Sequence, residues 1–278
     1  MKRGRTIMPI RLWGLIALTF AAGCHTNPTV PAVIAHRGGA MEVPENTLAA
    51  CRHALENRFD GVEIDARLSG DGRAVVIHDG TVDRTSGTTS NKRVRALDLA
   101  QLRAFDVGAP FNARFTGQRI PTLDDVLRLP WSTSTRLMIE VKREADYKLT
   151  NILPDDRALA AAVVKAVRTA PPRDGLLLAS FSPVLLRELH LRAPELPLIA
   201  IASTVKDVEP HLGLPLTAVA LNQNHVTPAF TERMRDRRIQ VWCWTVRKSS
   251  EISPLLDAGV DGIITDIPTT VRTQITGR

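Results

Sequence analysis

The sequence predicts an α/β protein folded as a (β/α)8 barrel, and three observations support that class. Eight apolar runs of strand length alternate with stretches of helical periodicity, which indicates parallel strands covered by helices. Residues 25–278, 254 in number, have the usual length of such a barrel. No glycine-rich phosphate loop follows the first strand, which argues against an open dinucleotide-binding sheet.

The elements follow one another regularly, with one interruption. The expected strands are Ala32–His36, Gly61–Leu68, Leu137–Val141, Leu176–Phe181, Leu198–Ala202, Ala218–Leu221, Ile239–Thr245 and Gly262–Asp266. Helices are expected at Thr47–Arg58, Thr122–Leu129, Asp155–Thr169, Pro183–Arg192, Thr227–Arg237 and Ser249–Ala258. Residues from about 70 to 118, with a further strand at Ala74–His78, break the alternation. We expect them to form a small insertion after the second strand, overhanging the mouth of a barrel that spans residues 32–278.

The first 23 residues have the features of an export signal. Four basic residues precede an apolar run, Leu12–Ala22, that is too short to span a bilayer. The sequence Ala21-Ala22-Gly23-Cys24 resembles the lipobox of bacterial lipoproteins, in which the cysteine takes a lipid and becomes the new N-terminus. The alternative is an ordinary signal peptide with a chance cysteine. We expect an exported protein held to a membrane by a lipid on Cys24, with residues 24–31 as a tether. His25 after the cysteine, in place of aspartate, favours the periplasmic face of an outer membrane.

Charge and cysteine content argue against two kinds of site. The chain has 36 basic and 29 acidic residues, and without its first 23 residues it has 32 basic against 29 acidic, a net charge of +3. So small an excess argues against nucleic-acid binding, and nothing in the sequence indicates a protein partner. No Cys-x-x-Cys pair or Cys/His cluster supports a zinc site. Cys51 and Cys243 either form a disulfide or are two buried thiols.

Carboxylates gather where the early strands end. Glu63 and Asp65 are two residues apart on one strand and therefore face the same side, and Glu140 precedes Lys142 in the same way on the next. In a (β/α)8 barrel, reactive groups at the carboxyl ends of strands meet at one mouth. Three carboxylates there would repel one another unless a cation lay between them. Oxygen ligands suit one hard divalent cation, Mg²⁺ or Ca²⁺.

Basic residues beside these acids complete a site for a phosphodiester. Arg37 offers a forked donor, and Lys142 a point charge, to non-bridging phosphate oxygens. His36 follows the first strand and His78 ends the inserted strand, and imidazole can serve as general base or acid near neutral pH. A cation, two histidines and two basic side chains are the components of phosphoryl transfer by positioning and electrostatics.

Short motifs in a fixed order strengthen this reading, and through them the chain resembles the glycerophosphodiester phosphodiesterase (GDPD) family. The motifs run from residue 33 to 268 and are His36-Arg37-Gly38, Pro44-Glu45-Asn46-Thr47, Glu63-Ile64-Asp65, Asp71-Gly72, His78-Asp79, Asp83-Arg84-Thr85, Ile120-Pro121-Thr122-Leu123, Glu140-Val141-Lys142, Ser180-Phe181, Trp244-Thr245-Val246 and Thr265-Asp266-Ile267-Pro268. The family often has asparagine after the Trp-Thr-Val motif, where this chain has Arg247. This position leaves two interpretations: a contact with the alcohol group of the substrate, or a solvated side chain.

The resemblance implies a TIM barrel with a short insertion and metal-dependent hydrolysis of glycerophosphodiesters to sn-glycerol 3-phosphate and an alcohol. It implies a metal held by Glu63, Asp65 and Glu140. It implies His36 and His78 as the acid/base pair, and Arg37 and Lys142 near the phosphate. The attacking oxygen belongs either to a glycerol hydroxyl, giving a cyclic phosphate, or to water.

Several further residues have two interpretations. Glu45 either supports the site and its substrate or only helps to begin a helix. Trp244 forms either a wall against the glycerol or part of the core. Asp266 either orders a neighbouring side chain or caps the last helix, and Asp83 and Arg84 are expected to pair within the insertion.

Two other functions remain open from the sequence. One is a phospholipase D-like or lysophospholipase D activity on lipid phosphodiesters, which would require an apolar groove beside the mouth. The other is a non-catalytic lipoprotein that binds glycerophosphodiesters. The intact set of acids and histidines argues against the second.

Overall fold

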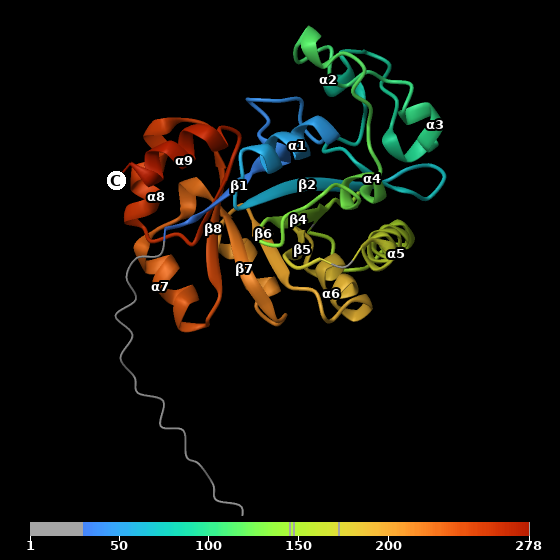
Figure 1. Ribbon diagram of the computed structural model, residues 1–278. Coiled ribbons are helices and arrows are strands. Elements are labelled where there is room, and N and C mark those ends of the chain that lie inside the picture. Colours follow the sequence, from blue (N-terminus) through green and yellow to red (C-terminus); the bar gives the residue numbers. More distant parts are fainter. Residues whose placement is uncertain (1–29, 145, 147, 172, 278) are drawn as a thin grey trace, which may run out of the picture.

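A closed barrel of eight parallel strands forms the body of the protein (Figure 1). The computed structural model describes residues 30–277 except 145, 147 and 172, so the predicted signal, Cys24 and most of the tether lie outside it. The strands run in the order β1, β2, β4, β5, β6, β7, β8 and β9, and β9 pairs with β1 to close the ring. The predicted (β/α)8 class is therefore confirmed. Within the described part, no helix has the length and apolarity that a membrane span requires.

The observed strands agree closely with the predicted ones. Their bounds are β1 Ala32–Ala35, β2 Gly61–Leu68, β4 Arg136–Val141, β5 Leu176–Ser180, β6 Leu198–Ala202, β7 Leu216–Asn222, β8 Gln240–Val246 and β9 Gly262–Thr265. Almost every strand residue is buried, as expected for a parallel sheet covered on both faces. Residues that face outward on β2, such as Val62 and Ile64, join the core under the helices, whereas Met138, Trp242 and Ile264 fill the interior of the barrel.

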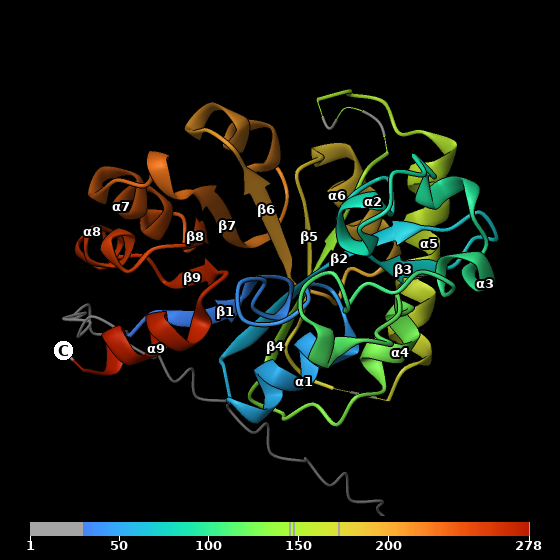
Figure 2. The same ribbon diagram turned by 90° about the horizontal axis from the view of Figure 1, so that it is seen from above.

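The helices surround the barrel, as seen from above in Figure 2. The longer ones are α1 Leu48–Glu56, α5 Pro154–Thr169, α6 Pro183–Arg192, α7 Pro228–Asp236, α8 Ile252–Asp257 and α9 Pro268–Thr276, with α4 Leu123–Leu127 between β3 and β4. At the starts of four helices, a side-chain hydroxyl oxygen accepts a hydrogen bond from a backbone N–H in the first turn; the acceptors are Thr47, Thr122, Ser182 and Thr227. Proline occupies the first turn of α5, α6, α7 and α9, where it has no N–H to leave unpaired.

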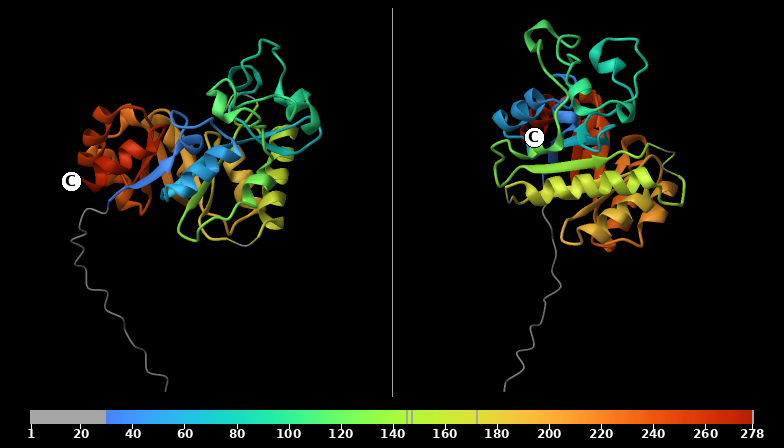
Figure 3. Two further views of the ribbon diagram at one scale, coloured as in Figure 1. Left: turned by 45° about the horizontal axis from the view of Figure 1, so that its top comes forward. Right: turned by 90° about the vertical axis from the view of Figure 1, so that its right-hand side faces the viewer.

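The segment after β2 forms a small unit beside the barrel mouth. It contains β3 Ala74–Val76, which is antiparallel to β2, and the short helices α2 Asp83–Ser86 and α3 Leu99–Leu102. Its own apolar cluster consists of Val75, Ile77, Val82, Val94, Leu97, Leu102, Val107 and Ile120. Figure 3 shows this unit beyond the carboxyl ends of the strands, away from the end at which the chain enters β1. The sequence did not outline α2 or α3, because four residues are too few to show a helical period.

Both cysteines of the barrel are free and buried. Of the two interpretations left open, the structure therefore supports the second: Cys51 in α1 and Cys243 in β8 are buried thiols and do not form a disulfide. Burial raises the pKa of the Cys51 thiol to about 12, so this group stays protonated and unreactive at neutral pH.

Candidate active site

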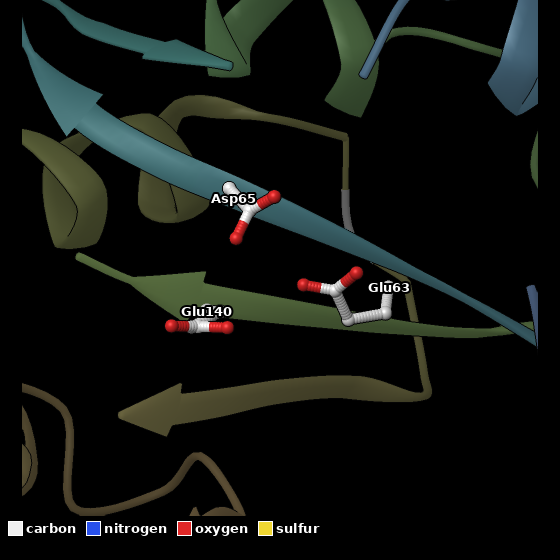
Figure 4. Close-up of side chains that lie close together, drawn as sticks. All are labelled: Glu63, Asp65 and Glu140. Atoms are coloured by element: carbon white, nitrogen blue, oxygen red, sulfur yellow. The ribbon is translucent and has the colours of Figure 1, made fainter. Parts of the chain in front are cut away.

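Three carboxylates meet inside the barrel at the carboxyl ends of two neighbouring strands. Glu63 and Asp65 lie on β2, and Glu140 lies on β4 directly opposite Asp65 in the strand pairing. One oxygen from each lies within 4.8 Å of the others, and Figure 4 shows the three groups around one space. All three residues are buried, Asp65 completely. The alternation of a strand thus places these acids together, as the sequence predicted.

Burial and mutual repulsion make this cluster electrostatically unfavourable on its own. Burial, followed by the charges of Asp65 and Glu140, raises the pKa of Glu63 well above its ordinary value. Burial also acts to raise the pKa of Asp65, but the positive charges of Lys142 and Arg37 outweigh it and hold that pKa below its usual range. Lys142 lies 2.7 Å from Glu140 Oε1 and 3.5 Å from Asp65 Oδ1. The cluster therefore depends on positive charge.

The donor set fits a hard divalent cation. Glu63 Oε1 and Asp65 Oδ1 are buried and have no hydrogen-bond partner. A buried carboxylate oxygen without a partner is costly, and a cation between the three groups would satisfy it. Oxygen ligands alone, with no cysteine or histidine in the group, suit Mg²⁺ or Ca²⁺ better than zinc.

A tight turn after β1 directs Arg37 toward the acids. Arg37 has φ of 52°, and Gly38 has φ of 87°, where any Cβ would come within 2.5 Å of Ala50. The backbone N–H of Arg37 donates to Glu63 Oε2 at 2.9 Å, and its Nε lies 3.3 Å from Asp65 Oδ2. Residue 38 must be glycine because a side chain there would be strained and would clash with Ala50, and the turn brings the amide and guanidinium of Arg37 to the cluster.

Glu45 lies behind Arg37 and does not line the cavity described below. Its carboxylate accepts from Arg37 Nη1 at 2.9 Å and from both terminal nitrogens of Arg84 at 2.7 and 2.8 Å. Of the two interpretations of Glu45, this position agrees with support of the site, without a place in the cavity lining. Glu45 instead fixes the guanidinium of Arg37 and connects α2 of the insertion to the barrel.

Replacing Glu45 with glutamine is expected to lower the free energy of unfolding at pH 7 by roughly 1–3 kcal/mol. Burial acts to raise the pKa of Glu45, but Arg84 and Arg37 lower it below its ordinary value. Because this pKa is lower in the folded than in the unfolded chain, the ionised carboxylate stabilises the fold at pH values above the unfolded-state pKa of about 4.3. The stabilisation is lost as the pH falls through the folded-state pKa. Urea denaturation at about pH 7 and pH 3.5 should show the deficit of the variant shrinking in acid. A deficit independent of pH would contradict this account, and exposed Glu209, as Glu209→Gln, is the control.

Each predicted catalytic histidine is held by a carboxylate. His36 Nδ1–H donates to Asp266 Oδ1 at 2.5 Å, and the other oxygen of Asp266 accepts from Arg247 Nε at 2.6 Å. Of the two interpretations of Asp266, the ordering of a neighbour is therefore confirmed. His36 Nε2 lies 3.9 Å from Glu63 Oε2, next to the carboxylate cluster.

The same arrangement recurs at His78. His78 Nδ1–H donates to Asp79 Oδ1 at 2.6 Å, and Asp79 Oδ2 accepts from Arg84 Nε at 2.7 Å. Asp83 does not pair with Arg84, contrary to our expectation. It accepts hydrogen bonds from the loop residues Thr88, Ser90 and Asn91. With Nδ1 bonded to a carboxylate, the Nε2 atom of each histidine is the one available to exchange a proton.

A cavity of about 230 Å³ connects these groups. Its lining includes both histidines, Arg37, Lys142 and two of the acids, and the remaining residues are Met138, Phe181, Ile201, Asn222, Gln223, Asn224, Trp244, Thr245, Arg247 and Ile264. The rings of Phe181 and Trp244 meet edge to face at 5.3 Å. Trp244 Nε1 donates to the carbonyl of Ala220, which fixes the indole as part of the wall. The wall interpretation of Trp244 is therefore consistent with its position.

Sequence reasoning missed the role of Asn46. Its side chain donates to Asp65 Oδ2 at 2.7 Å and accepts from the Asp65 backbone N–H at 3.1 Å, so both ends of the amide hold one acid. The residue has φ of 56°, a left-handed conformation that asparagine tolerates better than most. The Pro-Glu-Asn-Thr motif was a signal, but it suggested a helix cap, and the cap is Thr47.

Comparisons with known proteins agree with this geometry. Residues 36–270 match the Glycerophosphoryl diester phosphodiesterase family. The chain is 35% identical over 242 residues to a glycerophosphodiester phosphodiesterase of Caldanaerobacter subterraneus, covering 86% of this chain and 95% of that protein. Among solved structures, a putative glycerophosphoryl diester phosphodiesterase from Silicibacter pomeroyi has a TM-score of 0.80 at 25% identity and covers 90% of this chain and 95% of its own.

A second solved structure shows a relative with a bound molecule. It is a phosphodiesterase of Oleispira antarctica in complex with the product sn-glycerol-3-phosphate, with a TM-score of 0.80 at 26% identity. It covers 89% of this chain and 97% of its own. The family match over nearly the whole barrel, together with the 35% identical relative, shows that the chain belongs to the glycerophosphoryl diester phosphodiesterase family and is an enzyme of that hydrolase class.

Proposed function

We propose that this protein hydrolyses glycerophosphodiesters to sn-glycerol 3-phosphate and an alcohol, with a divalent cation, Mg²⁺ or Ca²⁺, held by Glu63, Asp65 and Glu140. The observation that carries the proposal is the carboxylate cluster itself, which has two buried oxygens without a hydrogen-bond partner and lies beside a cavity lined by two carboxylate-held histidines. The bound cation would polarise a phosphoryl oxygen and offset its charge.

The side chains of the chain supply the remaining steps. Arg37 and Lys142 stabilise the charge that grows on the non-bridging oxygens as the phosphorus is attacked. One histidine removes a proton from the attacking hydroxyl through Nε2, and the other delivers a proton to the departing alcohol oxygen. The same two transfers are required whether the attacking oxygen belongs to glycerol or to water. Phe181 and Trp244 offer apolar faces to the carbon atoms of glycerol.

A direct assay tests the proposal. The purified chain is offered glycerophosphocholine and glycerophosphoethanolamine with Mg²⁺, with Ca²⁺, or with EDTA. We expect release of glycerol 3-phosphate that EDTA abolishes and that one or both cations restore. Turnover unaffected by chelation, or a chain that binds both compounds without cleaving them, would refute the proposal. The second of these results would instead favour the non-catalytic alternative.

We further propose that the mature protein is anchored by a lipid on Cys24 at the periplasmic face of a bacterial membrane, the outer membrane being favoured. The lipobox-like sequence supports this. β1 begins at Ala32, and residues at the carboxyl ends of the strands line the cavity, so the chain enters the barrel at the end opposite the cavity. A short tether there would leave the cavity facing the aqueous phase, which favours soluble substrates over bilayer lipids. Mass spectrometry of the mature N-terminus should find a lipidated Cys24. An unmodified cysteine, or lysophospholipid cleaved faster than glycerophosphoethanolamine, would contradict this picture.

A further inference from the structure

The rim of the cavity across from the carboxylate cluster is lined by amide side chains and an arginine. The ends of β7 and β8 and the turn after β7 contribute Asn222, Gln223, Asn224 and Arg247 to this rim. The acids that line the cavity, Glu63 and Glu140, belong to the carboxylate cluster on the other side. The rim thus offers neutral amides and one fixed positive charge.

Arg247 is positioned to bind a second group. Its side chain is 56% exposed at the mouth, and its Nε is bonded to buried Asp266, which also holds His36. A guanidinium carries five N–H donors in a planar fork, and this bond uses one of them. Because Nε is bonded to Asp266, the terminal N–H groups of Arg247 point in a fixed direction. Binding of a ligand to them therefore costs little side-chain entropy. The backbone N–H groups of Arg247 and Lys248 donate to the carboxylate of neighbouring Glu251, which does not line the cavity.

The two halves of a glycerophosphodiester have different requirements. The glycerol is constant, and its carbon atoms suit the apolar wall that Phe181 and Trp244 form together with Met138, Ile201 and Ile264. The alcohol varies between substrates and must project toward the rim. Because Asp266 bonds both His36 and Arg247, a substrate whose alcohol departs beside His36 would bring that alcohol beside Arg247.

We propose that Arg247 selects glycerophosphodiesters whose alcohol carries an acidic group, such as the carboxylate of serine. The inference rests on the proposed function and adds the substrate class. An alcohol that carries a quaternary ammonium group would instead bind over an accessible aromatic ring. Here Lys142 Nζ already lies 5.8 Å from the centre of the Phe181 ring. Among the described residues of the rim, none has a carboxylate that could hold the ammonium group instead.

Glycerophosphoserine and glycerophosphoethanolamine form a matched pair for the test, because they differ by one carboxylate. The wild-type chain is expected to favour glycerophosphoserine in kcat/KM by roughly tenfold, the effect of one charge-assisted hydrogen bond. Arg247→Gln should bring this ratio near one, and Arg247→Glu should invert it. Any loss that both substrates share, through Asp266 and His36, cancels in the ratio. The neighbouring exposed cation, as Lys248→Gln, should leave the ratio unchanged.

Two results would overturn the inference: a wild-type ratio of one or below, or a ratio that Arg247→Gln does not alter. A wild-type chain that cleaves neither substrate would refute the proposed function instead. In that event, calorimetric binding of the two compounds to the wild-type and Arg247→Gln chains still decides the inference. The carboxylate-bearing compound should bind more tightly, and only while Arg247 is present.

Discussion

Replacing Glu63 with glutamine should reduce kcat/KM by roughly a thousandfold or more. A bound cation stabilises a phosphoryl transition state by several kcal/mol, and each 1.4 kcal/mol or so corresponds to a tenfold change in rate. The substitution keeps the shape of the side chain and removes one of the three charges that are proposed to hold the cation. The loss should be visible as a calorimetric loss of Mg²⁺ or Ca²⁺ binding as well as in the assay.

The stability of the same variant separates a functional role from a structural one. Burial and like charge raise the pKa of Glu63, so the ionised group is unfavourable when no cation is bound. In EDTA the Glu63→Gln variant should therefore unfold at a temperature equal to or above that of the wild type. Added cation should raise the unfolding temperature of the wild type but not that of the variant. A variant that is less stable in EDTA yet still active would show that Glu63 is structural.

A matched control is available far from the site. Glu195 has a side chain that is 56% exposed and lies 3.4 Å from Arg168. The Glu195→Gln variant removes the same charge from the surface and should change neither cation binding nor kcat/KM, because exposed pairs contribute little.

The reactive residues could be predicted because a strand alternates and parallel strands end together. Glu63, Asp65 and Glu140 follow from these two rules, and the structure places them as the rules require. The fold could be predicted for a similar reason: strands buried on both faces are continuous apolar runs, and their bounds came within a few residues of the observed ones.

The residues that position this site could not be predicted in the same way. Asn46 and Asp266 act through hydrogen bonds to side chains on other elements, with Asp266 separated from His36 by 230 residues. No periodicity relates such pairs. Arg84 is a clearer case, because the sequence suggests adjacent Asp83 as its partner, whereas the fold brings Glu45 and Asp79 to it.

Replacing either His36 or His78 with glutamine should reduce kcat by roughly 10²- to 10⁴-fold, the usual contribution of a general acid or base. Cation binding should be retained, since neither histidine belongs to the carboxylate cluster. Exposed His225, replaced in the same way, is the control. A loss of cation binding in either variant would show that the histidine acts on the metal site and not on the proton.

A substrate with a different leaving group can then show which histidine is the general acid and which is the general base. A p-nitrophenyl ester of glycerol phosphate has a leaving oxygen that departs without a proton, so it should restore activity to the variant that lacks the acid and not to the one that lacks the base. His36 is held by Asp266, the same carboxylate that bonds Arg247 at the rim, and an alcohol bound against Arg247 would depart beside His36. We therefore expect rescue of His36→Gln, with His78 as the base. Rescue of His78→Gln alone would place the departing alcohol on the His78 side of the cavity and away from Arg247.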